Sequence, residues 1–128
     1  MTYPILAAYF FSMLTALTVL FQLALAAGAP WGEMAMGGKY PGRFPPSLRV
    51  AAVVQALLLL CLALIVLTRA GLMFPGFYAF STVAIWFVVA FCALSAVLNS
   101  ITPSKKERRL WAPVTIVLLL CAIAVAVN

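Results

Sequence analysis

Few side chains in this chain of 128 residues are able to take part in acid–base or metal chemistry. The sequence has no histidine, which excludes imidazole metal sites and histidine-dependent catalytic triads. Glu33 and Glu107 are the only two acidic residues, which leaves little material for a carboxylate dyad or a hard-cation cage. We therefore predict no catalytic residue, no metal site and no cofactor.

Polar residues recur along the first apolar run of the chain. They are Ser12, Thr15, Thr18 and Gln22. Intervals of three, three and four residues place them on one face of a helix. Later apolar runs add Gln55, Ser81, Ser95 and Asn99. One interpretation is hydrogen bonding within and between helices, worth about 0.5–1 kcal/mol each. The other is a polar cleft, and its predicted residues are Thr15, Thr18, Gln22, Gln55 and Asn99.

Glu33 lies in a connecting segment that is rich in glycine, proline and aromatic residues (28–49). One interpretation is a structural ion pair with a nearby basic residue, and the candidates are Lys39, Arg43, Arg49, Arg108 and Arg109. The alternative is a site for a polar lipid headgroup or a charged small molecule, in which lysine and arginine meet phosphate. Its predicted residues are Trp31, Glu33, Lys39, Tyr40, Arg43, Arg108, Arg109 and Trp111.

The apolar runs lack the residues that two classes of small membrane protein need. No charged residue lies in the middle of any run, which disfavours small multidrug resistance transporters, because these depend on a glutamate in their first helix. Cys61, Cys92 and Cys121 form no C-x-x-C pair, which disfavours quinone-linked disulfide oxidoreductases. We expect the three thiols to behave as small apolar side chains.

The elements that carry these residues are predicted to be membrane-spanning helices. Hydrophobic residues make up 67% of the chain and charged residues only 8%, with a mean hydropathy of +1.21. Four apolar runs are long enough to cross about 30 Å of hydrocarbon, and they cover 5–27, 48–68, 77–99 and 110–127. We predict one all-α domain over 1–128, an integral membrane four-helix bundle with up-down topology and an ordered first loop.

Local signals mark the ends of these helices. Ser47 is the expected N-cap of the second helix. Ser104 and Glu107 fit a capping box, so the fourth helix is expected to begin well before its apolar part. Pro113 then lies inside that helix and is expected to kink it.

Basic residues predict the orientation in the membrane. Seven of the eight lie in or beside the first and third loops, and only Arg69 lies in the second. By the positive-inside rule, the loops 28–47 and 100–109 face the cytoplasm and both termini lie outside, in a cell (cytoplasmic) membrane. The charge of +6 is explained by this topology and by anionic lipid headgroups, so we do not predict nucleic-acid binding.

The chain resembles a family of small bacterial four-helix integral membrane proteins of the domain-of-unknown-function type. The likeness rests on Trp31, Gly37 and Gly38 and on the turn from Trp111 to Pro113. It implies an architecture and no catalytic residues. We expect a non-enzymatic structural, accessory or lipid-binding role, with membrane lipids and a homo-oligomer or a larger membrane complex as partners. A homo-oligomeric transporter or channel is the second hypothesis, and an enzyme that acts on a lipid headgroup is the third.

Overall fold

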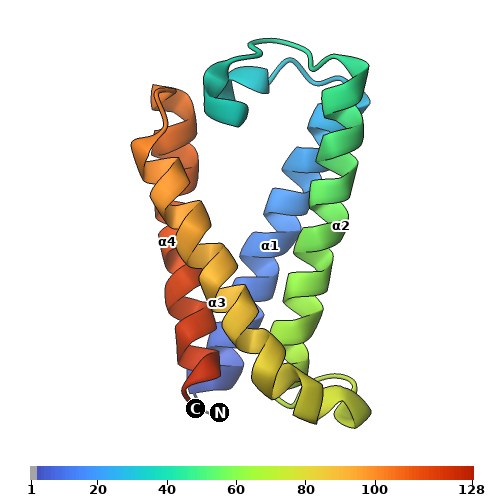
Figure 1. Cartoon of the computed structure of the whole chain (residues 1–128), viewed down its shortest axis with the longest axis vertical. Coiled ribbons are helices and arrows are strands. Elements are labelled where there is room, and N and C mark those ends of the chain that lie inside the picture. Colours follow the sequence, from blue (N-terminus) through green and yellow to red (C-terminus); the bar gives the residue numbers. More distant parts are fainter. Residues whose placement is uncertain (1–2) are drawn as a thin grey trace.

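The computed structural model describes residues 3–128, which contain helices and no β-strand. Four long helices make up most of this part: α1 (Tyr3–Ala27), α2 (Pro46–Arg69), α3 (Tyr78–Ile101) and α4 (Lys105–Ala126). All four are long and apolar enough to cross a membrane. The predicted all-α four-helix bundle is confirmed, and the protein is a small multi-pass membrane protein. Successive helices run in opposite directions (Figure 1).

The four helices form two pairs that diverge toward one end of the molecule. α1 packs along α2, and α3 packs along α4 (Figure 1). The pairs meet near the end that holds the chain termini, where a continuous core takes residues from every helix. Its members include Ala8, Phe11, Leu62, Val66, Ile85, Val88, Ala122 and Val125. At the opposite end the first loop lies across the space between the pairs (Figure 1).

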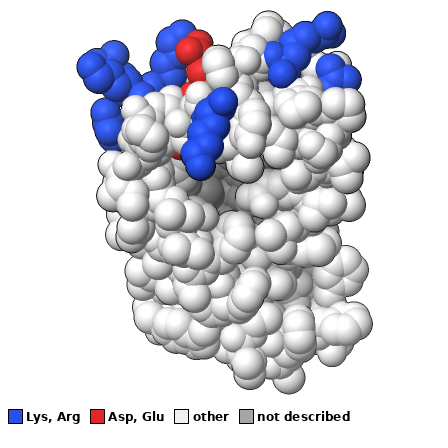
Figure 2. Space-filling model, turned by 45° about the horizontal axis from the view of Figure 1, so that its top comes forward, with Lys and Arg blue, Asp and Glu red and all other residues white. Residues whose placement is uncertain are grey.

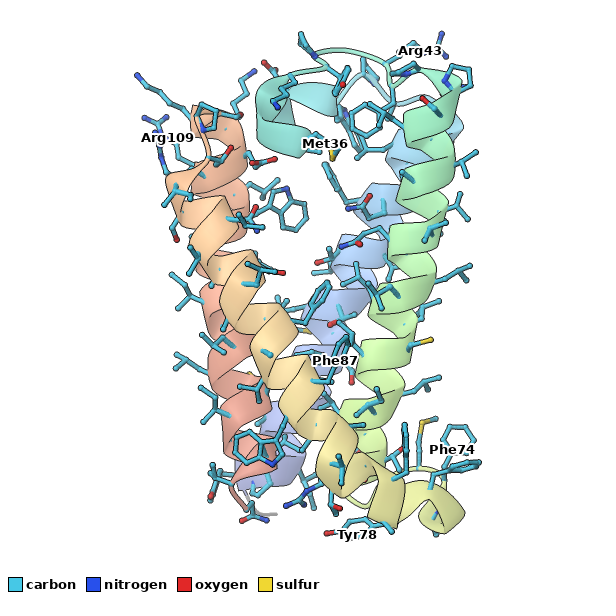
Figure 3. All side chains as sticks on the ribbon, viewed as in Figure 1. Met36, Arg43, Phe74, Tyr78, Phe87 and Arg109 are labelled. Carbon is cyan, nitrogen blue, oxygen red and sulfur yellow. The ribbon has the colours of Figure 1, made fainter. Side chains whose placement is uncertain are left out.

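The outer surface of the bundle is apolar, as contact with lipid requires. Leu20, Val83 and Phe87 leave 62%, 74% and 60% of their surface exposed. A soluble protein of this size would not leave so many large apolar side chains in water. The outward-facing side chains in Figure 3 are mostly hydrocarbon along the length of the helices.

Three helix starts differ from the sequence prediction, and α1 is already helical at Tyr3 where the predicted span begins at residue 5. α2 begins at Pro46, with Pro45 at the N-cap position, so Ser47 is not the N-cap and that prediction is wrong. A proline at the first helical position loses no hydrogen bond, because that N–H has no partner inside the helix. A short 3₁₀ turn, η3 (Pro75–Phe77), precedes α3, so the α-helix starts at Tyr78 and extends to Ile101, beyond the predicted 99.

The start of α4 follows only half of the predicted capping box. Ser104 is the N-cap, and its Oγ accepts a hydrogen bond from the Glu107 N–H at 3.2 Å. The Glu107 carboxylate does not return this bond, and instead accepts one from the Gly37 N–H in the first loop at 3.3 Å. Farther along, α4 runs as one helix through Pro113.

The first loop is ordered, as predicted, and contains two 3₁₀ turns, η1 (Gly32–Met34) and η2 (Met36–Gly38). Its two halves are joined by a hydrogen bond from the Gly32 N–H to the Gly42 carbonyl (2.9 Å). Two side chains, of the α4 N-cap and of the second turn of α4, bind it to that helix. Ser104 Oγ donates to the Glu33 carbonyl (2.6 Å), and Trp111 Nε1 donates to the Met34 carbonyl (3.0 Å). The loop is therefore the covalent link between α1 and α2, and it is also held to α4 by hydrogen bonds.

The first and third loops lie at the same end of the bundle, and basic side chains gather there (Figure 2). Arg43 and Arg109 project from this end in Figure 3, whereas Phe74 and Tyr78 lie at the other. Arg69, the basic residue of the second loop, donates hydrogen bonds to the Asn128 carbonyl (2.7 Å) and to the Tyr78 hydroxyl (3.3 Å). The seven basic residues in or beside the first and third loops therefore lie at one end of the molecule (Figure 2), and Arg69 lies at the other.

Candidate ligand-binding cavity

A cavity of about 370 Å³ lies between the two helix pairs, beneath the first loop. Residues of all four helices and of the loop line it. Its roof comes from Met34, Ala35 and Met36, and its deep end from Phe11, Leu62 and Leu118. In Figure 2 the surface is hollowed on the face where α2 and α3 diverge, directly below the basic side chains. The position gives a molecule in the bilayer access from the side.

All five residues of the predicted polar cleft line this cavity: Thr15, Thr18, Gln22, Gln55 and Asn99. The structure brings them together from three helices, α1, α2 and α3. Ser12, which the sequence places on the same stripe, is not among the lining residues, and its hydroxyl donates to the Ala8 carbonyl at 2.8 Å. The stripe therefore faces the cavity only from Thr15 onward.

Several polar groups of the cavity have no protein partner. Thr15 is only 2% exposed, and its hydroxyl is the one fully buried side-chain polar atom in residues 3–128 that makes no hydrogen bond. Gln22 and Gln55 are half-buried, and within the described chain neither side-chain amide bonds to another protein group. Because buried polar groups are nearly always paired, these amides and this hydroxyl are suited to water or a ligand.

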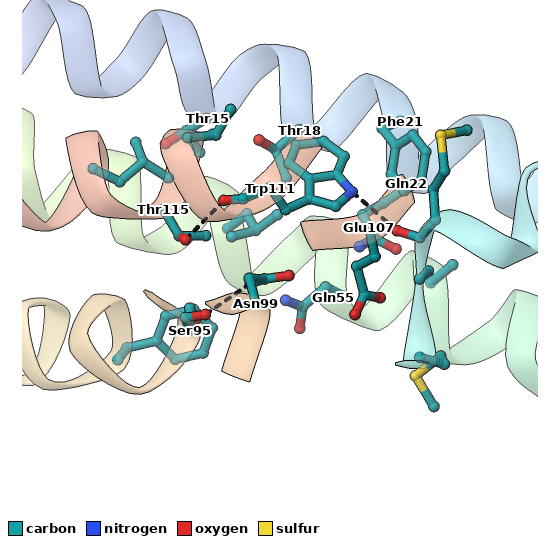
Figure 4. A pocket seen from close by; sticks show the side chains of 18 of the residues that line it. Thr15, Thr18, Phe21, Gln22, Gln55, Ser95, Asn99, Glu107, Trp111 and Thr115 are labelled. Atoms are coloured by element: carbon teal, nitrogen blue, oxygen red, sulfur yellow. Dashed lines mark hydrogen bonds between the residues drawn. The ribbon is translucent and has the colours of Figure 1, made fainter. Parts of the chain in front are cut away.

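Glu107 also lines the cavity, whereas the sequence predicts it only as part of a capping box. It is 7% exposed, and Figure 4 shows its carboxylate directed into the same space as Gln22, Gln55 and Asn99. Among the described residues, the carboxylate accepts one hydrogen bond, from the N–H of Gly37. Within residues 3–128 the ion pair found is between Lys106 and Glu33, so Glu107 has no lysine or arginine nitrogen within 4.0 Å.

The sequence does hold a signal for Glu107. Glu107, Trp111 and Thr115 are four residues apart, which places them on one face of α4, and all three line the cavity. The capping-box pattern accounts for a glutamate at this position, and the four-residue spacing additionally relates it to the face that lines the cavity.

Aromatic side chains close the side of the cavity opposite its mouth. The rings of Phe21 and Trp111 meet edge to face with centroids 4.8 Å apart, joining α1 to α4. Trp31 of the first loop stacks on Phe21 at 6.1 Å. The bond from Trp111 Nε1 to the Met34 carbonyl fixes the orientation of the indole. The cavity thus has a rigid aromatic wall beside its polar residues.

The predicted headgroup residues do not gather in the cavity, and of that set only Trp111 lines it. Lys39, Tyr40 and Arg109 are exposed at the loop end. Arg43 Nε donates to the Gly28 carbonyl (2.8 Å), and Arg108 Nη1 donates to the Thr102 carbonyl (3.0 Å). These basic residues therefore surround the loop end rather than the cavity.

Glu33 forms the ion pair that the sequence suggested, but with a different partner. Its Oε1 lies 2.5 Å from Lys106 Nζ, and the candidates Lys39, Arg43, Arg49, Arg108 and Arg109 are not involved. The bond from Ser104 to the Glu33 carbonyl brings η1 over the first turn of α4, where Lys106 is the nearest cation. Both side chains are well exposed, so the pair contributes little stability.

Residues 3–128 contain no group of three or more metal-ligating side chains, and the three cysteines in them are free thiols. Cys92 lines the cavity, and Cys61 lies exposed on the outer surface.

Comparison with protein-family models, curated proteins and solved structures finds no match for this chain. The geometry of the cavity is therefore the basis for assigning a role.

Proposed function

We propose that this membrane protein binds an amphiphilic molecule of the bilayer, such as a lipid, without changing it chemically. The observation that carries the proposal is a cavity between the helix pairs whose polar groups lack protein partners. Its volume of about 370 Å³ falls within the range of small-molecule sites, roughly 300–1,000 Å³.

The depth of the cavity suits a molecule with a polar head and an apolar tail. Thr15 lies twelve residues before the end of α1 at Ala27, which is about 18 Å along the helix. The polar part of the lining therefore reaches from the loop end to about the middle of a bilayer of ordinary thickness, and the apolar deep end at Phe11 lies one turn farther. The carboxamides and Glu107 lie nearer the loop end, and an apolar tail has access to lipid between α2 and α3.

The geometry supports binding more than transport or catalysis. A route through one bundle would continue past Thr15, but there Ser12 bonds to its own helix and Phe11 and Leu62 close the core. The enzyme hypothesis rested on Glu33, which is paired with Lys106 and lies outside the cavity. Membership of the bacterial membrane-protein family named above, and assembly with other chains, stay predictions.

A tryptophan placed at the mouth of the cavity tests the proposal. Ala51 lines the cavity and is exposed, so a large side chain there blocks entry without disturbing the core. We expect Ala51→Trp to raise the Kd of dodecyl amphiphiles about tenfold, or about 1.4 kcal/mol. The probes are dodecylammonium, dodecanol and dodecanoate, added to protein in phosphatidylcholine nanodiscs. Native mass spectrometry of the released protein reports saturable one-to-one binding.

Val50→Trp is the matched control, because Val50 is the neighbouring residue, is 65% exposed and does not line the cavity. This variant is expected to bind like the wild type. Equal binding by Ala51→Trp and Val50→Trp would mean that the probes adhere to the outer surface, and the proposal would be rejected.

We also propose that the end carrying both basic loops faces the cytoplasm, as the positive-inside rule expects in a cytoplasmic membrane. Seven of the eight basic residues lie in or beside these loops. Alkaline phosphatase fused to the C-terminus is expected to be active, and green fluorescent protein at the same position to be dark after export by the general secretory route. A fluorescent fusion together with an inactive phosphatase fusion would reverse the orientation.

A further inference from the structure

We propose that the molecule bound in this cavity carries a primary ammonium group, and that Glu107 pairs with it. The inference rests on the proposed binding function and names the chemistry of the ligand's head. It begins from charge: Glu107 lines the cavity, whereas no lysine or arginine is among the lining residues. A phosphate or carboxylate head would meet a glutamate there and no cation.

The Glu107 carboxylate has capacity left for a donor. Oε2 accepts from the Gly37 N–H, and no donor from residues 3–128 is found for Oε1. The N-terminus of α4 and this one bond stabilise a negative charge in part. A carboxylate that is 7% exposed and has no cation within 4.0 Å is nevertheless costly, and a bound ammonium supplies the missing partner.

The neighbouring amides supply the further acceptors that an ammonium needs. A primary ammonium has three N–H donors and no acceptor. Gln22 and Gln55 point toward the same space as Glu107 in Figure 4. Asn99 donates one N–H to the Ser95 carbonyl at 2.7 Å, which leaves its side-chain carbonyl free to accept. One carboxylate and three amide carbonyls therefore face the position of the head.

Trp111 adds an aromatic face one helical turn from Glu107. The bond from its Nε1 to the Met34 carbonyl holds the indole in place beside the cavity. Cations are attracted to the face of a tryptophan ring, and more strongly where water is excluded. A carboxylate, amide carbonyls and an indole together favour an alkylammonium over an alcohol of the same length.

Two kinds of molecule carry a primary ammonium group of this kind: a simple alkylamine, and a phospholipid with an ethanolamine head. The ethanolamine head also carries a phosphate, and the basic side chains that gather at the loop end are the groups that would meet it (Figure 2). Dodecylammonium tests the ammonium by itself. Exchange of phosphatidylethanolamine for phosphatidylcholine in the nanodisc, followed by mass analysis of the retained lipid, tests the phospholipid source.

Glu107→Gln is the test of the inference, because glutamine keeps the shape and still accepts from the Gly37 N–H. Wild-type protein is expected to bind dodecylammonium about tenfold more tightly than dodecanol. Glu107→Gln is expected to remove that preference and to leave dodecanol binding unchanged. Glu33→Gln is the matched control, since it removes the other acid, which is exposed and outside the cavity. It should bind both probes like the wild type.

The possible failures point to different conclusions. If dodecylammonium and dodecanol bind the wild type equally, the ammonium inference is wrong while amphiphile binding stands. If Ala51→Trp has no effect on any probe, the binding function itself is wrong. The wild-type comparison requires no variant, so the inference stays testable even if Glu107→Gln does not fold.

Discussion

Gly32→Ala is expected to separate the two halves of the first loop and to lower the stability of the protein by about 1–3 kcal/mol. A Cβ at this position would lie 1.9 Å from the Tyr40 carbonyl oxygen and 2.7 Å from that of Gly42. Both neighbours are backbone atoms, so no side chain can rotate away. The loop must move, and the bond from the Gly32 N–H to the Gly42 carbonyl is lost. Thermal unfolding in detergent, followed by circular dichroism, measures the change in Tm.

The same substitution is expected to weaken ligand binding, because Met34 and Ala35 of this loop line the cavity roof. Gly76→Ala is the control, since a Cβ there meets nothing within 4 Å and the backbone is not in the left-handed region. Its Tm should stay close to that of the wild type. Equal Tm values for the two variants would mean that the loop tolerates the added methyl group.

Phe11→Ala is expected to have the largest effect of any single substitution proposed for this protein. Phe11 is 1% exposed and belongs both to the core that joins the helix pairs and to the deep end of the cavity. Truncation of a buried phenylalanine costs about 3–5 kcal/mol, because contacts are lost and a void remains. We expect a markedly lower Tm and a lower yield of folded protein.

Phe10→Ala provides the matched control, because Phe10 precedes Phe11 in the chain and is 47% exposed on the outer surface. Lipid or detergent fills the space left there, so only a small change in Tm is expected. A similar fall in both variants would show that aromatic content, and not the packing at position 11, sets the stability.

The helices could be predicted from the sequence because each depends on local information. An apolar run of sufficient length forms a helix in a bilayer, where every backbone group must bond within its own segment. The polar stripe of α1 was predictable for the same reason, because spacing alone decides which residues share a face. The five residues of the predicted cleft share one cavity although they come from three helices.

The contacts between distant segments could not be predicted in the same way. The partner of Glu33 is Lys106, 73 residues away, and the donor to Glu107 is Gly37, 70 residues away. Both depend on how the first loop folds over α4, which no local pattern specifies. The start of α2 was misplaced on a finer scale, because Ser47 has the ordinary chemistry of an N-cap while Pro45 and Pro46 fix the backbone before it.

The divergence of the helix pairs has a mechanical consequence. The pairs are joined by the core near the termini, so any rotation of one pair about that core would move its far end most (Figure 1). Pro46 at the far end of α2 lies 16 residues from Leu62 in this core, or about 24 Å, so a rotation of one degree would move that end by about 0.4 Å. The first loop bridges the two pairs at that far end, through the hydrogen bonds that Ser104 and Trp111 donate to it. The hydrogen bonds of the first loop therefore act where a change in the spacing of the two pairs would be largest, and they oppose widening of the cavity there.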